Sequence, residues 1–264
     1  MRSLGAAALL LLAACSGSRG EGPAPERTTL PDEVKQTGTA FLQPETRALQ
    51  EDDFANPGML WVDRGRSLFR ETIGQSKSCA ACHGEDGSEL DAAASHYPQV
   101  DEESGELVNL EGRINLCRTR HQGLEPLDYE SDPLLALTTY VAHLSEGAPM
   151  SVDVSGAAAP YYEQGQDYFF TKRGQFNLAC SQCHNEHWGE KLRGDTISQG
   201  HGNSFPAYRL EWQTLGSLHR RLSDCDAGVR AEPYPLGSDI YTAVELYLAK
   251  RAEGLPVETP GIRR

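Results

Sequence analysis

The chain has 264 residues, with 38 acidic side chains against 24 lysines and arginines, and its net charge is −14. This acidic balance argues against nucleic-acid binding, which requires a basic face. The mean hydropathy is −0.50, and no apolar run reaches the roughly 18 residues that cross a bilayer. The length allows one large domain or two of about 100 to 120 residues.

The first residues are typical of an export signal rather than of a folded segment. Arg2 is followed by a short apolar run, which ends in Leu12-Ala13-Ala14-Cys15 and resembles the bacterial lipoprotein cleavage box. We therefore expect residues 1–14 to be a signal peptide, Cys15 to be lipidated, and the protein to lie in the periplasm, anchored at the inner or outer membrane. An ordinary signal peptide with an incidental Cys15 is the alternative, and it also predicts export.

Two Cys-x-x-Cys-His motifs follow, and this pattern attaches c-type haem covalently. They are Cys79-Ala80-Ala81-Cys82-His83 and Cys180-Ser181-Gln182-Cys183-His184. Each cysteine pair would form two thioether bonds, and His83 and His184 would each supply an axial iron ligand. A zinc site would not demand a histidine directly after each cysteine pair. The sequence therefore predicts two haem c groups.

The two halves of the chain align with each other. When Cys117 is placed on Cys225, Leu110 falls on Leu218 and Arg113 on Arg221 without a gap. Further matched pairs are Pro98 with Pro206, Leu107 with Leu215, Gly65 with Gly165, and Tyr140 with Tyr247. So many coincidences indicate an internal duplication.

Apolar spacing predicts four helices, over residues 60–72, 132–145, 161–171 and 238–252. Asp132 and Ser238 are expected as N-caps, with Gly147 and Gly254 as stops. Helix, haem motif, long loop and terminal helix is the order of a cytochrome c domain. We therefore predict an all-α fold of two cytochrome c-like domains with long loops, related by internal duplication. The expected domains are residues 46–152 for haem 1 and residues 153–264 for haem 2. Residues 15–45, rich in Gly, Pro, Ser, Glu and Thr, are expected to be a flexible tether.

Each haem iron needs a second axial ligand from the loop after its motif. Met59 and Met150 lie outside that loop. Histidines occur there without matching between the halves: His96, His121, His201 and His219. Only Cys117 and Cys225 match, so we favour His83 with Cys117 and His184 with Cys225 as the iron ligands. A Cys117–Cys225 disulfide, or two buried free thiols, are the alternatives.

Arginines distinguish the second half from the first. If Cys225 lies on a helix, Arg221 is one turn before it on the same face, and Arg113 has the same relation to Cys117. A nearby cation lowers the pKa of a thiol. Only the second half adds Arg220 and, upstream, Arg209, and arginine binds oxyanions with two parallel hydrogen bonds. This pattern predicts an anion site, and salt bridges to the many acidic side chains are the alternative.

With these residues the chain resembles the SoxA family, the di-haem subunit of the SoxAX cytochromes of bacterial sulfur oxidation. The matching motifs are Gln50-Glu51-Asp52-Asp53, Asn56-Pro57-Gly58, Trp61-Val62, Asn115-Leu116-Cys117-Arg118, Pro206, Tyr208-Arg209, Trp212, Gly216 and His219 to Cys225. The resemblance covers residues 46–252. The block from Pro206 to Cys225 is specific to the family, whereas the haem motif alone is not.

The resemblance implies two cytochrome c domains related by a pseudo-two-fold and a heterodimer with the small c-type cytochrome SoxX. It implies L-cysteine S-thiosulfotransferase activity, which is the oxidative conjugation of thiosulfate to a cysteine of SoxY in the SoxYZ carrier. The product is a cysteine S-thiosulfonate, and electrons pass to the SoxX haem and on to a downstream small c-type cytochrome. Cys225 would carry a persulfide, and Arg221 would bind the substrate with help from Arg220 and Arg209.

Two other functions remain open on the sequence. One is a thiosulfate dehydrogenase, which couples two thiosulfates into tetrathionate and also uses His/Cys haem ligation. The other is a non-catalytic electron-transfer lipoprotein, in which both haems act only as wires. A di-haem peroxidase is disfavoured because it needs an open iron position.

Overall fold

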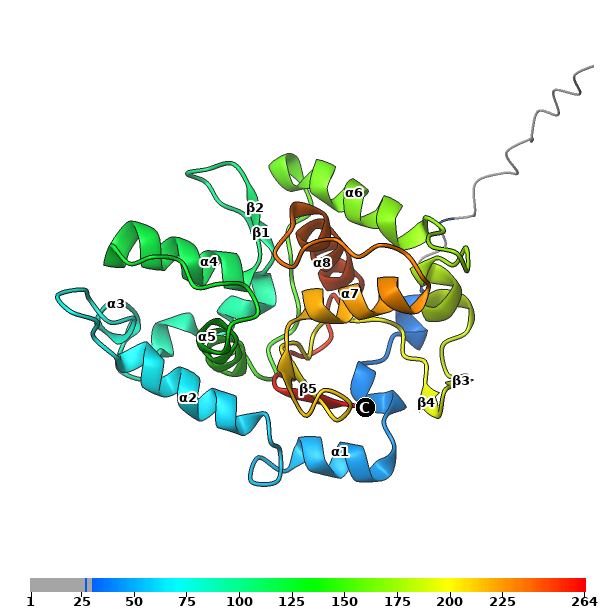
Figure 1. Ribbon diagram of the computed structural model, residues 1–264, viewed down its shortest axis with the longest axis horizontal. Helices are drawn as coiled ribbons and strands as arrows, with labels where there is room; N and C mark the ends of the chain where they lie inside the picture. Colours follow the sequence, from blue (N-terminus) through cyan, green and yellow to red (C-terminus); the bar gives the residue numbers. More distant parts are fainter. Residues whose placement is uncertain (1–26, 28–29) are drawn as a thin grey trace, which may run out of the picture.

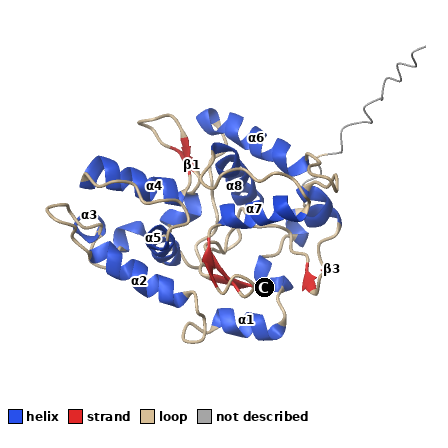
Figure 2. Ribbon diagram, viewed as in Figure 1, coloured by secondary structure: helices blue, strands red, loops and turns tan. Residues whose placement is uncertain are grey.

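The computed structural model describes residue 27 and residues 30–264 (Figure 1). Helices dominate, as predicted, and the few strands are short (Figure 2). The α-helices are α1 Pro44–Glu51, α2 Met59–Arg70, α3 Ala80–His83, α4 Leu110–Cys117, α5 Asp132–His143, α6 Ala159–Phe170, α7 Leu218–Gly228 and α8 Asp239–Arg251. Short π-helices cover Arg118–Gln122 and Gln182–Glu186.

The strands refine the all-α prediction, because they form three small sheets in the described part of the chain. β1 (Gln99–Val100) pairs with β2 (Leu107–Val108), and β3 (Lys191–Leu192) pairs with β4 (Asp195–Thr196), both antiparallel. β5 (Ala207–Arg209) is the centre of the third sheet, antiparallel to β6 (Thr214–Gly216) and parallel to β7 (Gly261–Arg263). This third sheet joins the end of the chain to the hairpin that precedes α7.

Two pairs of crossed helices form the framework, α2 with α5 and α6 with α8. Figure 1 shows the first pair on one side of the molecule and the second on the other. Each pair has its own apolar core. The first includes Val62, Phe69, Leu137 and Tyr140, and the second includes Phe169, Leu222, Val244 and Tyr247. All four helices were predicted from apolar spacing, and each boundary falls within two residues of the prediction.

A third core joins the two halves. It includes Leu107 of β2, Met150, Leu246 of α8 and Val257. Backbone hydrogen bonds reinforce it, because Gly147 N–H donates to the Val257 carbonyl at 2.9 Å and Met150 N–H donates to the Leu255 carbonyl at 2.9 Å. The segment after α5 therefore pairs with the segment after α8, which fixes the two halves against each other.

The prediction of a flexible tether over residues 15–45 is wrong for its described C-terminal part. Residues 32–34 and 38–41 form 3-10 turns. The buried Gln199 amide accepts from Gln36 N–H and donates to the Val34 carbonyl, both at 2.8 Å, and the Thr37 hydroxyl donates to Glu258. Polar side chains of the second half thus form hydrogen bonds that order residues 32–41, although the composition of this segment predicts no regular structure. The predicted signal peptide, residues 1–14, and Cys15 lie outside the described residues.

The helix caps differ from the prediction in one case. Ser131, not Asp132, is the N-cap of α5, and the Asp132 carboxylate instead accepts from Trp61 Nε1 at 2.9 Å and pairs with Arg64 at 2.7 Å. Gly147 and Gly254 have φ of +79° and +81°, as expected of residues that follow a helix end. In the part of the chain that the structure describes, no helix is both long and apolar enough to cross a membrane.

Candidate haem and anion site

The second haem motif presents an imidazole that is ready to bind a metal. His184 Nδ1 lies 2.7 Å from the Ser198 carbonyl, so Nδ1 carries the proton and Nε2 is left for a ligand bond. Burial lowers the pKa of His184 to about 4, which keeps the ring neutral. Gly200 packs against the ring, because a Cβ there would lie 2.8 Å from His184 Cγ. The ring orientation is therefore fixed by its surroundings.

Helix α7 places Cys225 next to this motif. Ser217 caps the helix by accepting from Arg220 N–H at 3.2 Å, and the predicted one-turn spacing of Arg221 and Cys225 is confirmed. Burial raises the pKa of the Cys180 thiol to about 12, and the nearby Cys225 raises it further. Burial also raises the pKa of Cys183, and Cys225 raises it further, so Cys225 lies close to both motif cysteines.

The three predicted anion-binding arginines differ in their partners. Arg209 is buried and pairs with Glu211 at 3.0 Å, although its Nε has no partner, and Arg220 lies 3.9 Å from Glu130. Within the described residues, no hydrogen bond or ion pair involves the Arg221 side chain, whose charge lowers the pKa values of both His184 and Arg209. Arg209 therefore forms a salt bridge, which is the alternative to anion binding, and Arg220 has only a long contact with a carboxylate. Arg221 forms no salt bridge among the described residues.

The corresponding cations of the first half are neutralised. Arg113 pairs with the buried Asp101 at 2.9 Å, and Arg120 binds both oxygens of the same carboxylate at 2.9 and 2.8 Å. The Arg120 and Ser104 hydrogen bonds lower the pKa of Asp101, so it stays ionised. Burial raises the pKa values of Cys79 and Cys117, and these thiols lie close enough to the motif for Cys117 to raise the pKa of Cys79 further and for Cys82 to raise that of Cys117. The equivalent arginines thus differ, because Arg113 is paired with a carboxylate and Arg221 is not. Arg118, which follows Cys117, also has no ion pair among the described residues, and its Nε donates to the Glu125 carbonyl at 3.2 Å.

Other ligand arrangements fit less well. All six described cysteines are free, so the alternative of a Cys117–Cys225 disulfide is wrong. Two loop histidines are engaged elsewhere: His201 Nε2 lies 3.3 Å from Gln199, and His219 accepts from Gly237 N–H at Nδ1 and lies 3.1 Å from Glu245 at Nε2. His96 Nδ1 lies 2.8 Å from the Ser151 carbonyl, which leaves its Nε2 unassigned.

Two residues of this region were missed in the sequence. Arg251 of α8 is buried, lies 4.5 Å from the Phe169 ring centroid, and donates to Asn185 at 2.8 Å while its Nε has no partner. A charge within an apolar helical face is the signal that could have revealed it. The sequence marks Trp212 only as a residue that matches the family, and the structure shows that its ring contacts Arg209 and Arg220.

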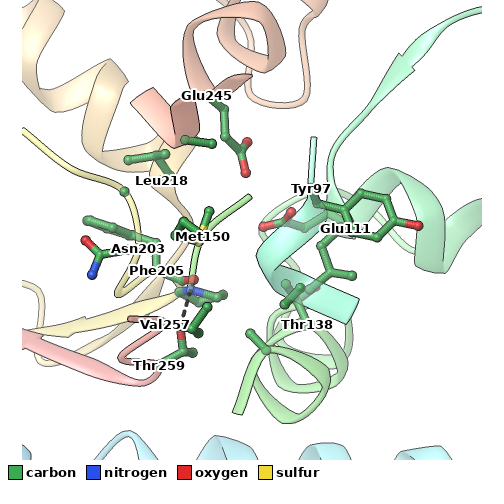
Figure 3. A pocket seen from close by; sticks show the side chains of 16 residues that line it. Tyr97, Glu111, Thr138, Met150, Asn203, Phe205, Leu218, Glu245, Val257 and Thr259 are labelled. Atoms are coloured by element: carbon green, nitrogen blue, oxygen red, sulfur yellow. Dashed lines mark hydrogen bonds between the residues drawn. The ribbon is translucent and has the colours of Figure 1, made fainter. Parts of the chain in front are cut away.

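A cavity of about 50 Å³ lies between the two halves and is separate from this site (Figure 3). Its lining includes Glu111, Thr138, Met150, Glu245 and Val257, but neither Cys225 nor Arg221. Figure 3 shows Glu111 of α4 and Glu245 of α8 pointing toward each other across it.

Comparison with known proteins agrees with this geometry. The family model described as "SoxA/TsdA, cytochrome c domain" matches residues 64–150. The L-cysteine S-thiosulfotransferase subunit SoxA of Pseudaminobacter salicylatoxidans is 38% identical over 86% of this chain and 80% of its own length. The SoxA subunit of Rhodovulum sulfidophilum is 36% identical over 88% and 81%. The chain belongs to the SoxA family.

A solved structure of SoxXA from P. pantotrophus has the same fold, with a TM-score of 0.82, 36% identity and coverage of 86% of each chain. Membership of a cytochrome c family means that the chain carries covalently bound haem c. The residues fit this group at the second motif, because Cys180, Cys183 and Cys225 are free thiols near one another and His184 is neutral with Nε2 available. At the first motif Cys79 and Cys82 are likewise free.

Proposed function

We propose that this protein is the SoxA subunit of an L-cysteine S-thiosulfotransferase, which conjugates thiosulfate to a cysteine of SoxY in the SoxYZ carrier. The names of its relatives support this activity. The observation that carries the proposal is the unneutralised Arg221 one turn before Cys225, beside the His184 motif. A pure electron carrier has no need of such a cation.

The proposed cofactors are two haem c groups. Cys79 and Cys82 would attach the first and Cys180 and Cys183 the second. The axial ligands would be His83 with Cys117 and His184 with Cys225. When bound, these haems supply one-electron acceptors, and thiolate ligation holds their potential low. The first site differs from the second by its Asp101 salt bridges, which favours electron relay rather than anion chemistry there.

In the proposed reaction, Arg221 binds a sulfonate oxygen of thiosulfate, with Arg220 and Arg209 adding positive charge at the same site. The carrier thiol loses its proton and forms a bond to the sulfane sulfur of thiosulfate. One cysteine S-thiosulfonate, one proton and two electrons result, and the electrons leave through SoxX to a downstream small c-type cytochrome. Cys225 is proposed to take part as a persulfide, which is consistent with a free, half-buried thiol beside Arg221.

The solved SoxXA structure supports SoxX as the partner in a heterodimer. We further propose a periplasmic location with a membrane tether through lipidated Cys15, which rests on the cleavage-box sequence. An intact mass of the purified chain tests the lipid, the two haems and the persulfide together. It should equal the chain from Cys15 plus lipid, two haems and one additional sulfur atom.

The proposed duplication is supported at the cavity between the halves. Its lining includes five pairs of residues that are 107 or 108 positions apart in the sequence: Tyr97 with Phe205, Leu110 with Leu218, Thr138 with Glu245, Ala142 with Ala249, and Met150 with Val257. Such pairing is expected of a cavity on a pseudo-two-fold axis between residues 46–152 and 153–264.

The main experiment is Cys225→Ala in the SoxAX complex, with the carrier and thiosulfate as substrates. Both haems should still attach, because the thioether cysteines remain, while the mass of the carrier no longer increases by a thiosulfonate group. Retained full activity overturns the assignment. Since the family model also covers TsdA, tetrathionate should be assayed without the carrier, and its rapid formation would favour a thiosulfate dehydrogenase.

A further inference from the structure

The Trp212 indole is held in one orientation by its own hairpin and by α7. Its Nε1–H donates to the Asp224 carboxylate at 2.9 Å, and Asp224 directly precedes Cys225. The ring lies against Gly216 of β6, where a Cβ would be only 2.4 Å from a ring carbon. A ring that is hydrogen-bonded on one side and packed against backbone on another has little freedom to move.

This fixed ring contacts two guanidinium groups. The Arg220 Cζ lies 4.2 Å from the Trp212 ring centroid and the Arg209 Cζ lies 5.0 Å from it. A cation over an indole is stabilised by about 0.5 to 2 kcal/mol, and more strongly when it is buried. Arg209 is only 6% exposed, so its contact with the ring belongs to the stronger kind.

The contact matters because carboxylates compete for the same arginines. Glu211 binds only Nη2 of Arg209, which leaves Nε buried without a partner, and Glu130 remains 3.9 Å from Arg220. Burial depresses the pKa of Arg209, and the nearby charge of Arg221 depresses it further. An aromatic face stabilises neighbouring cations without neutralising them, and their donors remain available to an anion.

We propose that Trp212 is the positioning residue of the anion site, holding Arg209 and Arg220 beside Arg221 and Cys225 so that they bind the sulfonate group. This role rests on the proposed function. A purely structural tryptophan would be expected in an apolar core, and none of the three cores includes Trp212. Its partners are instead two arginines and the carboxylate next to the proposed catalytic cysteine.

The test compares Trp212→Leu, Trp212→Phe and Trp61→Leu in the SoxAX complex. Trp61 is a matched control, because its Nε1–H also donates to an aspartate, Asp132, and its ring contacts Tyr208 of the same hairpin, but none of the described cation–π contacts involves it. Trp212→Leu should raise the KM for thiosulfate at least tenfold with little change in kcat, since ground-state binding is lost. Trp212→Phe keeps a π face and should have a smaller effect, and Trp61→Leu should leave KM unchanged.

Gly216→Ala provides a second variant that alters no side chain of the site. Its Cβ would lie 2.4 Å from the Trp212 ring and 3.0 Å from Oε1 of Glu130, so it displaces the ring and should raise KM in the same direction as Trp212→Leu. An unchanged KM in Trp212→Leu with full haem content, or an equal rise in Trp61→Leu, overturns the proposal.

Calorimetric titration of the oxidised complexes with thiosulfate compares the affinity of the unaltered complex and of Trp212→Leu in the absence of turnover. Weaker binding by Trp212→Leu than by the unaltered complex supports the role even if carrier conjugation itself fails. Equal affinities, or no binding to the unaltered complex, overturn it.

Discussion

Gly65 of α2 lies directly against the carbonyl oxygen of Ala136 of α5, so that a Cβ at Gly65 would be 2.0 Å from that oxygen. The other helix pair has the same contact, with Gly165 of α6 at 2.0 Å from the Ala243 carbonyl. Both glycines allow two helix backbones to cross in direct contact, next to Tyr140 and Tyr247 respectively.

Gly65→Ala and Gly165→Ala should therefore each separate a helix pair. Overpacking at a well-packed contact costs about 1 to 3 kcal/mol, and more where the clash is with backbone. The measurement is the denaturant midpoint of the haem-loaded protein. Gly228→Ala is the control, because no atom beyond its chain neighbours and its own helix backbone lies within 4 Å of its Cβ position in α7, and alanine is the better helix former. A loss of stability no larger than that of Gly228→Ala would show that the helix pairs accommodate the added methyl group without strain.

Gly200→Ala should disturb the His184 ligand specifically. Gly200 has φ of +74° and its Cβ position lies 2.8 Å from His184 Cγ, whereas Gly105 has the same φ of +74° with nothing within 4 Å. Both substitutions carry the left-handed strain of about 1 to 2 kcal/mol. Only Gly200→Ala should also change the electron paramagnetic resonance signal of the second haem. Identical spectra in the two variants would contradict the proposed ligand.

Arg221→Gln should raise the KM for thiosulfate by roughly 10- to 100-fold, since a hydrogen bond to a charged group contributes about 1.5 to 3 kcal/mol. Arg113→Gln is the matched control at the equivalent position of the first half. Its guanidinium pairs with Asp101, which Arg120 continues to hold, so thiosulfate turnover should not change. An equal loss in both variants would indicate a general electrostatic effect rather than an anion site.

The sequence was sufficient for features that depend on local spacing. The four long helices and the one-turn relation of Arg221 to Cys225 follow from periodicities that a chain carries by itself. Order in residues 32–41 was missed because it depends on partners such as Gln199 and Glu258, which are distant in sequence. Composition reports the intrinsic preference of a segment, and long-range hydrogen bonds overrode it here.

The same limit applied within the site. Glu130 lies near Arg220 and Glu211 pairs with Arg209, whereas no carboxylate reaches Arg221 among the described residues. No spacing rule predicts which of the three arginines is left without a carboxylate partner. The β5–β6 hairpin brings Trp212 over two arginines, which likewise is a tertiary contact. Residue types therefore predicted an anion site, and the fold determined which cation remains available.

The cavity between the halves encloses a buried carboxyl pair. Burial raises the pKa of Glu111 well above its ordinary value, and the nearby Glu245 and Glu130 raise it further. Glu245 accepts from Asn109 at 3.0 Å and lies 3.1 Å from His219 Nε2. Because His219 Nδ1 accepts from Gly237 N–H, Nε2 carries the ring proton and faces Glu245. Glu111 is thus the protonated member of the pair.

This protonation makes stability depend on pH in a defined direction. Above pH 4.5 the unfolded chain releases the Glu111 proton, whereas the folded protein keeps it, so the folded state binds more protons. The free energy of unfolding should then decrease as pH rises, by at most about 1.4 kcal/mol per pH unit, until Glu111 ionises in the folded state. Glu111→Gln retains a donor toward Glu245 and should remove this slope, making the variant more stable than the unaltered protein at pH 7. Denaturant titrations between pH 5 and pH 8 measure how the free energy of unfolding changes with pH, and Glu71→Gln, at an exposed position, is the control. The same slope in the unaltered protein and both variants would show that Glu111 is ionised in the folded protein.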